Sequence, residues 1–181
     1  MQGKIDAMCG VYSIINSLLY LDCIENQDEA EKLFKKIIKR EAEIFPIAFY
    51  DGMNFKNMKH LLDNEIGRRK DIQYYRPIKR EISIYQFLNR LEEELPVSRK
   101  TAAILGLGRP LHHWTVVTKI SNNKGKRTLH LFDSYLGKTK IPQEKLCSSN
   151  RGQIPPFYKP ELKIPKLTEV YTNELFIIHK K

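Results

Sequence analysis

The 181-residue sequence has few cysteines, no paired cysteine motif and no long apolar run. Three cysteines, none in a C-x-x-C pair, exclude a small disulfide framework. No uninterrupted apolar stretch approaches the ~18–20 residues of a transmembrane helix. Since the first residues do not form a basic-then-apolar leader, we expect a cytoplasmic protein of the producing cell. Secretion or delivery into a target cell without a cleaved signal peptide is the alternative.

The composition is that of an ordinary soluble domain. Hydrophobic residues make up 41% and charged residues 29% of the chain, which excludes collagen, coiled coil and wholesale disorder. The length matches one domain, residues 1–181, with a hydrophobic core that needs no disulfide or metal for stability.

The chain carries an excess of positive charge, with 31 Lys and Arg against 21 Asp and Glu and a net charge of +10. Such an excess favours an acidic partner, an anionic surface or a nucleic acid. The basic clusters lack the interleaved aromatic residues of a base-stacking surface, so nucleic acid is the less favoured partner.

Two kinds of hydrophobic pattern divide the chain. Apolar residues at helical spacing predict a helix that begins at Cys9, and three similar runs follow it. Shorter runs rich in β-branched and aromatic residues predict strands in the second half. We therefore expect an α+β fold, with N-terminal helices packed on one side of a C-terminal antiparallel sheet. The other helices are expected from 26 to before 46, at 55–66 and at 83–95, the strands at 101–107, 114–120, 128–132 and 174–179, and an extended surface segment at the proline-rich stretch 141–172.

Cys9 is the candidate nucleophile because it stands at the start of the first predicted helix. A thiol attacks as the thiolate, and the partial positive charge of a helix N-terminus stabilises that anion. Cys23 lies near the other end of the same helix, where the dipole has the opposite sign, and Cys147 lies in the proline-rich stretch. The alternative for Cys9 is a small buried apolar residue.

A cysteine nucleophile needs an imidazole, which a third group orients. His113 stands at the mouth of one predicted strand, and Asp133 stands at the far end of the next. A three-residue turn centred on Asn123 would pair these two residues directly, whereas a turn with an even number of residues would need a bulge to bring them to one face. The alternatives are a structural histidine, with His112 serving in its place, and a turn-forming aspartate.

The order of these elements resembles the papain-like fold cysteine peptidases, in which the nucleophile opens a central helix and a His and an Asp or Asn follow on the sheet. The matching segments are 6–13 (DAMCGVYS), 113–117 (HWTVV) and 131–134 (LFDS). The residues of these segments look closest to those of two bacterial groups. These are the leader-cutting peptidase domains of bacteriocin exporters and the papain-like toxin domains. The resemblance implies a catalytic triad of Cys9, His113 and Asp133, and an oxyanion role for Gln2.

This resemblance implies a thiol-dependent hydrolase that cleaves peptide or isopeptide bonds through a thioester. A protein glutamine deamidase or transglutaminase would use the same triad, since the acceptor of the thioester defines the reaction. A different class is an inactive binding module or a nucleic-acid binder.

We expect no cofactor and no metal. No pair of histidines or cysteines has metal-ligand spacing, and the adjacent His112 and His113 would point to opposite faces of a strand. The expected partner is a protein or peptide substrate. For a bacterial toxin or effector, an acidic immunity or inhibitor protein would complement the basic surface.

Overall fold

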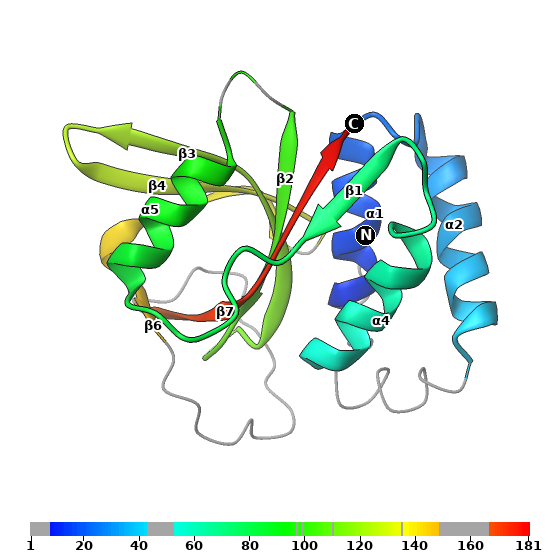
Figure 1. Cartoon of the computed structure of the whole chain (residues 1–181), viewed down its shortest axis with the longest axis horizontal. Coiled ribbons are helices and arrows are strands. Elements are labelled where there is room, and N and C mark those ends of the chain that lie inside the picture. The colour runs from blue at the N-terminus through cyan, green and yellow to red at the C-terminus, as the bar shows by residue number, and fades with distance from the viewer. Residues whose placement is uncertain are drawn as a thin grey trace.

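The computed structural model describes residues 8–42, 53–96, 98, 100–109, 111–134, 136–148 and 167–181, which form four α-helices and a seven-stranded sheet (Figure 1). The α+β class and the four helices expected from the sequence are confirmed. None of the helices in these ranges is long and apolar enough to cross a membrane. The helices are α1 (Cys9–Tyr20), α2 (Gln27–Arg40), α4 (Phe55–Glu65) and α5 (Ile84–Glu94), and the strands are β1 (Ile72–Tyr75), β2 (Thr101–Leu107), β3 (His113–Asn123), β4 (Lys126–Asp133), β5 (Gly137–Pro142), β6 (Leu146–Ser148) and β7 (Thr168–Lys180).

The helix starts differ in how they are capped. The side chains of Asn26, Asn54 and Ser83 each accept a hydrogen bond from a backbone N–H in the first turn of α2, α4 and α5. The residue before α1 is Met8, whose side chain forms no such bond, and the first turn of α1 contains no acidic residue. The positive end of the α1 dipole is therefore not offset by a polar cap or by a carboxylate of its own first turn.

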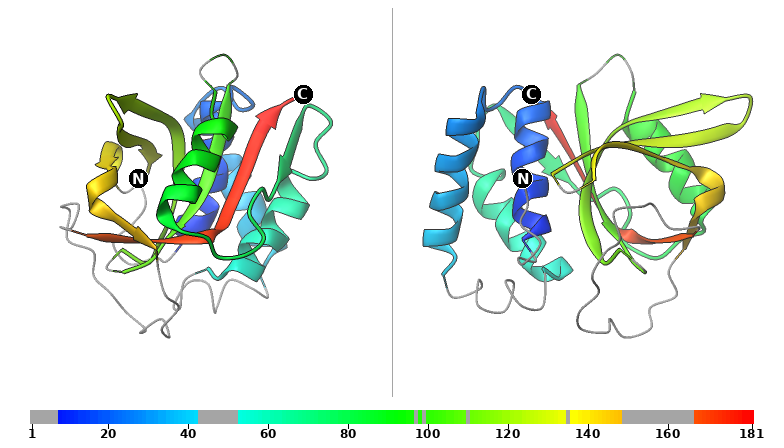
Figure 2. Two further views of the ribbon diagram at one scale, coloured as in Figure 1. Left: turned by 60° about the vertical axis from the view of Figure 1, so that its left-hand side comes forward. Right: turned by 180° about the vertical axis from the view of Figure 1, so that it is seen from behind.

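The sheet separates two hydrophobic cores. Ile104, Trp114 and Val116 point to the face covered by α1, α2 and α4, whereas Leu105 and Val117 point to the opposite face. Helix α5 packs on that second face, so the expectation that all helices lie on one side is wrong (Figure 2). Since the sheet is buried on both faces, its strands are apolar at successive positions. The α5 residues in the second core are Phe87, Leu88 and Leu91.

The sheet runs β1-β7-β2-β3-β4-β5 with antiparallel neighbours, and β6 adds to β7 in parallel. Strands β1, β5 and β6 were not expected. The stretch 141–172 is not wholly an extended surface segment, because Ile141 and Leu146 are buried and β7 begins at Thr168. Residues 149–166 of this stretch lie outside the described residues. Pro142 fits the end of β5 because this strand lies at a sheet edge, where a missing N–H donor is tolerated.

Candidate active site

Cys9, His113 and Asp133 meet at the N-terminal end of α1. His113 Nε2 lies 2.8 Å from Asp133 Oδ2, and the Cys9 side chain is hydrogen-bonded to the same imidazole. Because Asp133 occupies Nε2, the other ring nitrogen is left for the sulfur. The three residues singled out in the sequence are thus in contact, although α1, β3 and β4 contribute one each.

A two-residue turn joins β3 and β4. Lys124 and Gly125 have φ values of 51° and 82°, as the tight type I′ hairpin turn requires. Of the two turns left open by the sequence, the structure has the one with an even number of residues, and Asn123 pairs with Lys126 at the end of the ladder. With an even number of turn residues, the ladder needs an irregularity to bring the histidine and the aspartate to one face.

A β-bulge supplies that irregularity. The register shifts after Val117, which pairs with Leu131. Continuing this register places Thr115 opposite Asp133, with His113 as the diagonal neighbour on the same face. The bulge expected for an even turn is thus confirmed, and it sets the histidine and the aspartate side by side.

The electrostatics of the cluster favour a charged imidazole. Burial alone would lower the pKa of His113, but its hydrogen bonds to Asp133 and Cys9 and their negative charges raise it to about 10. Burial alone would raise the pKa of Asp133, but the hydrogen bond and charge of His113 lower it below its ordinary value. The N–H of Leu136 supports the carboxylate by donating to Oδ1 at 2.8 Å. At neutral pH an imidazolium therefore faces a carboxylate on one side and the sulfur on the other.

All three side chains are largely buried. The relative exposure of Cys9 is 6%, and the side chains of His113 and Asp133 are 11% and 3% exposed. In such a low-dielectric setting a charge pair interacts more strongly than in water. The cluster therefore lies in the interior and is not a contact between exposed side chains.

Asn16 and Ser134 form a second link between α1 and β4 that the sequence reading missed. Asn16 Nδ2 donates to Ser134 Oγ at 2.9 Å, and Ser134 Oγ donates to Asn16 Oδ1 at 3.1 Å. Asn16 is two turns after Cys9 on one face of α1, and Ser134 directly follows Asp133. The pair therefore ties α1 to the residue that follows Asp133. The sequence did contain a signal for this link, because Asn16 is a polar residue seven positions after Cys9 within an apolar helix face.

His112 does not take the place of His113. Its backbone has φ 42°, a left-handed conformation that costs energy in a non-glycine residue, and its N–H donates to the Gly108 carbonyl at 2.8 Å. Burial chiefly lowers the pKa of His112, which lies in the field of Glu169 and Arg109. This turn reverses the chain so that β3 begins at His113.

The other residues considered in the sequence are not part of the described cluster. Gln2, the expected oxyanion residue, lies outside the described residues. Cys23 and Cys147 are free thiols away from this cluster, and burial raises the pKa of each. The described part of the chain contains no group of three or more His, Cys, Asp or Glu side chains that could hold a metal ion. The absence of a cofactor stays a prediction.

Fold and site together define an α+β protein with a Cys–His–Asp cluster at a helix N-terminus. Protein-family models, curated proteins and solved structures show no match to this chain. A function has to follow from the geometry of the cluster.

Proposed function

We propose that the protein is a papain-like cysteine peptidase, a thiol-dependent hydrolase that acts on a peptide or isopeptide bond of a protein substrate. The observation that carries this proposal is the contact of one imidazole, His113, with both Cys9 and Asp133. A nucleophile, a base within hydrogen-bond reach and a group that orients the base are the three parts that covalent catalysis needs.

The architecture supports the same class. Helix α1 contacts α2 and α4 on one side and strands β2, β3 and β4 on the other, so the nucleophile opens the central helix of the fold. The N-terminus of α1, where the Met8 side chain forms no capping hydrogen bond, adds a positive field at Cys9. The imidazolium of His113 places a second positive charge beside the Cys9 sulfur.

Each residue has one role in the proposed reaction. The Cys9 sulfur attacks the carbonyl carbon, and the backbone N–H at the start of α1 stabilises the oxyanion that forms. His113 gives its proton to the leaving amine as the C–N bond breaks, which leaves a thioester on Cys9. A water molecule then attacks the thioester while His113 takes its proton. The C–S bond breaks, the acid leaves, and Asp133 has held the ring in one orientation throughout.

A direct test is the rate of alkylation of each cysteine by iodoacetamide at pH 6.5. Cys9 should react at least tenfold faster than Cys23 and Cys147, whose thiols are held protonated by burial. The His113→Ala variant should lose this difference and keep the slow rates of the other two. Equal, slow labelling of all three in the folded wild-type protein would contradict an activated thiolate.

The mass of the reaction product separates the proposed peptidase from its alternatives. Fragments of a protein substrate support hydrolysis of the main chain. An intact substrate about one dalton heavier identifies a glutamine deamidase, and a cross-linked product identifies a transglutaminase. Either of these two outcomes overturns the peptidase assignment while keeping the triad.

A role as a bacterial toxin is a further proposal, supported by the resemblance and by the net charge of +10 that an acidic immunity protein would complement. Expression in a bacterial cytosol should slow growth, and Cys9→Ala should remove the effect at equal protein level. Harmless expression of the folded wild-type chain would contradict this role.

A further inference from the structure

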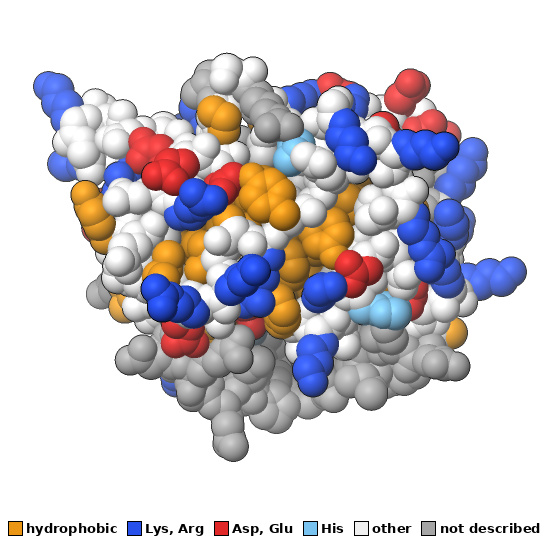
Figure 3. All heavy atoms as spheres, in the orientation of Figure 1, with side chains coloured by type: hydrophobic (Ala, Val, Ile, Leu, Met, Phe, Trp, Pro, Cys, Tyr) orange, Lys and Arg blue, Asp and Glu red, His pale blue; other side chains and the backbone are white. Residues whose placement is uncertain are grey.

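A second candidate site lies among the helices. A cavity of about 290 Å³ opens between α2, the end of α4 and the C-terminal half of α1. Four positively charged side chains line it, Lys36, Arg40, Arg68 and Arg69, against one carboxylate, Glu65. Two further carboxylates, Glu41 and Asp71, are bonded to Arg40 and Arg69, so the four cations stand against three carboxylates and the local excess is one positive charge. Figure 3 shows Lys and Arg side chains gathered over this helical side of the molecule, on the right of the view.

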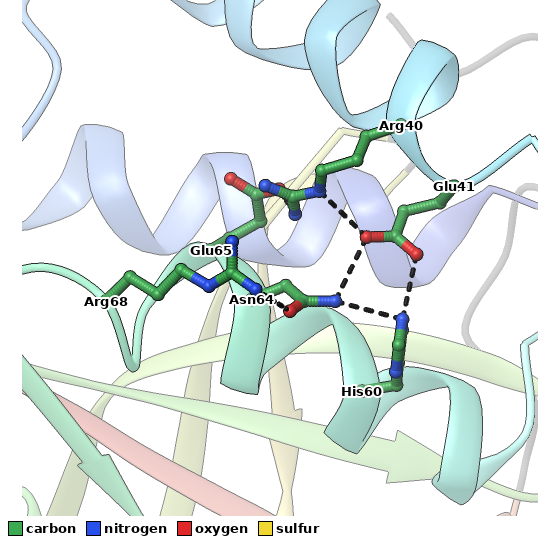
Figure 4. A network of polar contacts seen from close by, with 6 residues as sticks. All are labelled: Arg40, Glu41, His60, Asn64, Glu65 and Arg68. Atoms are coloured by element: carbon green, nitrogen blue, oxygen red, sulfur yellow. Dashed lines mark hydrogen bonds and ion pairs between the residues drawn. The ribbon is translucent and has the colours of Figure 1, made fainter.

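The acidic groups near the cavity are already engaged. Arg40 Nη2 is paired with Glu65, and Arg40 Nε donates to Glu41 at 2.9 Å. Arg68, in contrast, donates to the neutral Asn64 Oδ1 at 3.0 Å. Neither Arg68 nor Lys36 has a carboxylate partner among the residues that the structure describes. Figure 4 shows the side chains of Arg40 and Arg68 extending toward one another, an arrangement of like charges that an anion would stabilise.

The position of Arg68 is set by a chain of hydrogen bonds. Glu41 is 7% exposed in its side chain and accepts from His60 Nε2 at 2.8 Å and from Asn64 Nδ2 at 3.1 Å. Burial alone would raise the pKa of Glu41, but Arg40 and His60 lower it, so this carboxylate is charged. With its NH₂ group held by Glu41, Asn64 turns its carbonyl oxygen toward Arg68. The arginine is thus oriented before any ligand arrives.

Hydrogen bonds also hold the opposite wall of the cavity in place. Arg69 Nη2 donates to the Cys23 carbonyl at 3.1 Å and to Asp71 at 3.2 Å. The apolar part of the lining comes from Leu33 and from the fully buried Leu18, which stands nine residues after Cys9 on α1. That distance is about 13 Å along the helix, so the cavity is separate from the catalytic cluster.

We propose that this cavity binds a phosphate group. The guanidinium group of Arg68 offers planar donors that match phosphate oxygens, and Lys36 adds a mobile point charge. Lys36 and Arg68, which have no carboxylate partner among the described residues, are the two cations left to meet the ligand. The volume lies at the lower end of ligand pockets, which suits free phosphate or the phosphate end of a small ester. A bound phosphate would link α2 to the residues after α4 above the floor provided by α1.

Calorimetric titration of the whole chain tests this site. Inorganic phosphate and glycerol phosphate should bind saturably at constant ionic strength, and succinate should bind at least tenfold more weakly. Lys36→Gln and Arg68→Gln should each weaken phosphate binding about tenfold, the worth of one charge-assisted hydrogen bond. The matched control is Lys32→Gln, which removes one charge from α2 outside the lining and should change the affinity less than twofold. Tighter binding of the ester identifies a phosphorylated small molecule as the source, and tighter binding of inorganic phosphate identifies the free ion.

Three results would overturn the proposal: no saturable binding at tens of millimolar phosphate, equal loss in Lys32→Gln and the two lining variants, or succinate binding as tight as phosphate. Both lining side chains are exposed, so their variants should fold, as circular dichroism would check. The Cys9→Ala variant should bind phosphate as the wild type does. Failure of the phosphate site and failure of the thiol chemistry are therefore separate results.

Discussion

His113 Nε2 and Asp133 Oδ2 are 2.8 Å apart across neighbouring strands of one hairpin, with both side chains largely buried. The carboxylate is held on its second oxygen by the Leu136 N–H, so it can neither rotate nor leave the ring without losing two bonds. The imidazole therefore keeps one orientation while it is also hydrogen-bonded to Cys9.

The charge of Asp133 should set the alkaline limit of activity. His113 is active as an imidazolium and its pKa is raised to about 10, so kcat/KM should stay level above neutrality and fall as pH approaches 10. Asp133→Asn keeps a hydrogen-bonding side chain but removes the negative charge, so the alkaline limb should move to lower pH. Asp133→Ala should lose more activity, because the ring also loses its orientation. If the fall of kcat/KM at high pH stays at the same pH in Asp133→Asn, that fall is not caused by deprotonation of His113 beside Asp133.

The same pair should make the stability of the fold depend on pH. The pKa of His113 is raised in the fold, so its contribution is complete below the ordinary value of 6.5 and is lost as pH rises toward 10. The pKa of Asp133 is lowered, so its contribution is present above 3.8 and is lost at lower pH. Urea unfolding from pH 6 to 10 should show a decline that is smaller in His113→Gln. An equal decline of the free energy of unfolding with pH in the wild type and in His113→Gln would contradict this contribution of His113.

Asn16 should act as a positioning residue. Asn16→Ala leaves Ser134 without its partner and should lower the free energy of unfolding by about 1–3 kcal/mol. It should also slow alkylation of Cys9, because the link between α1 and β4 is lost. Ser17→Ala is the matched control, since the Ser17 hydroxyl donates to the Ser13 carbonyl within α1. A double-mutant cycle with Ser134→Ala should show coupling of about 0.5–3 kcal/mol. Equal slowing in both α1 variants would reduce Asn16 to a structural residue.

Substitution of the two adjacent histidines should separate their roles. His112→Gly keeps the backbone N–H and suits φ 42°, so the variant should fold and retain activity. His112→Val places a β-branched residue in the left-handed region and should cost about 1–3 kcal/mol of stability. His113→Ala should abolish activity without unfolding the chain. If His112→Gly folds but loses activity, the proposed assignment of the base to His113 is wrong.

The hydrophobic pattern was sufficient for the elements that bury a face of their own. The four helices were expected from helical spacing, and in the structure Asn26 and Ser83 cap two of them. Strand β2 was expected at its observed bounds, Thr101–Leu107, because it is apolar throughout. In each case the signal and the stabilising contacts lie within one short segment.

The short strands were not visible in the hydrophobic pattern of the sequence. The four residues of β1 pair with the last residues of β7, Ile72 with Lys180, so their stability comes from a partner at the other end of the chain. The second face of the sheet, with α5 upon it, likewise depends on how strands from distant segments align. The cavity proposed to bind phosphate joins side chains of three helices and of the residues after α4, and the sequence does not show that its basic clusters meet.

The candidate site divides in the same way. Residue chemistry and the ends of elements were readable along the chain, because a cysteine that opens a helix and a histidine and an aspartate at strand ends are local features. Their contact required the two-residue turn at Lys124, the bulge after Val117 and the packing of α1 against β3 and β4. Local propensity comes from neighbours along the chain, whereas a distance between two side chains depends on every element packed between them.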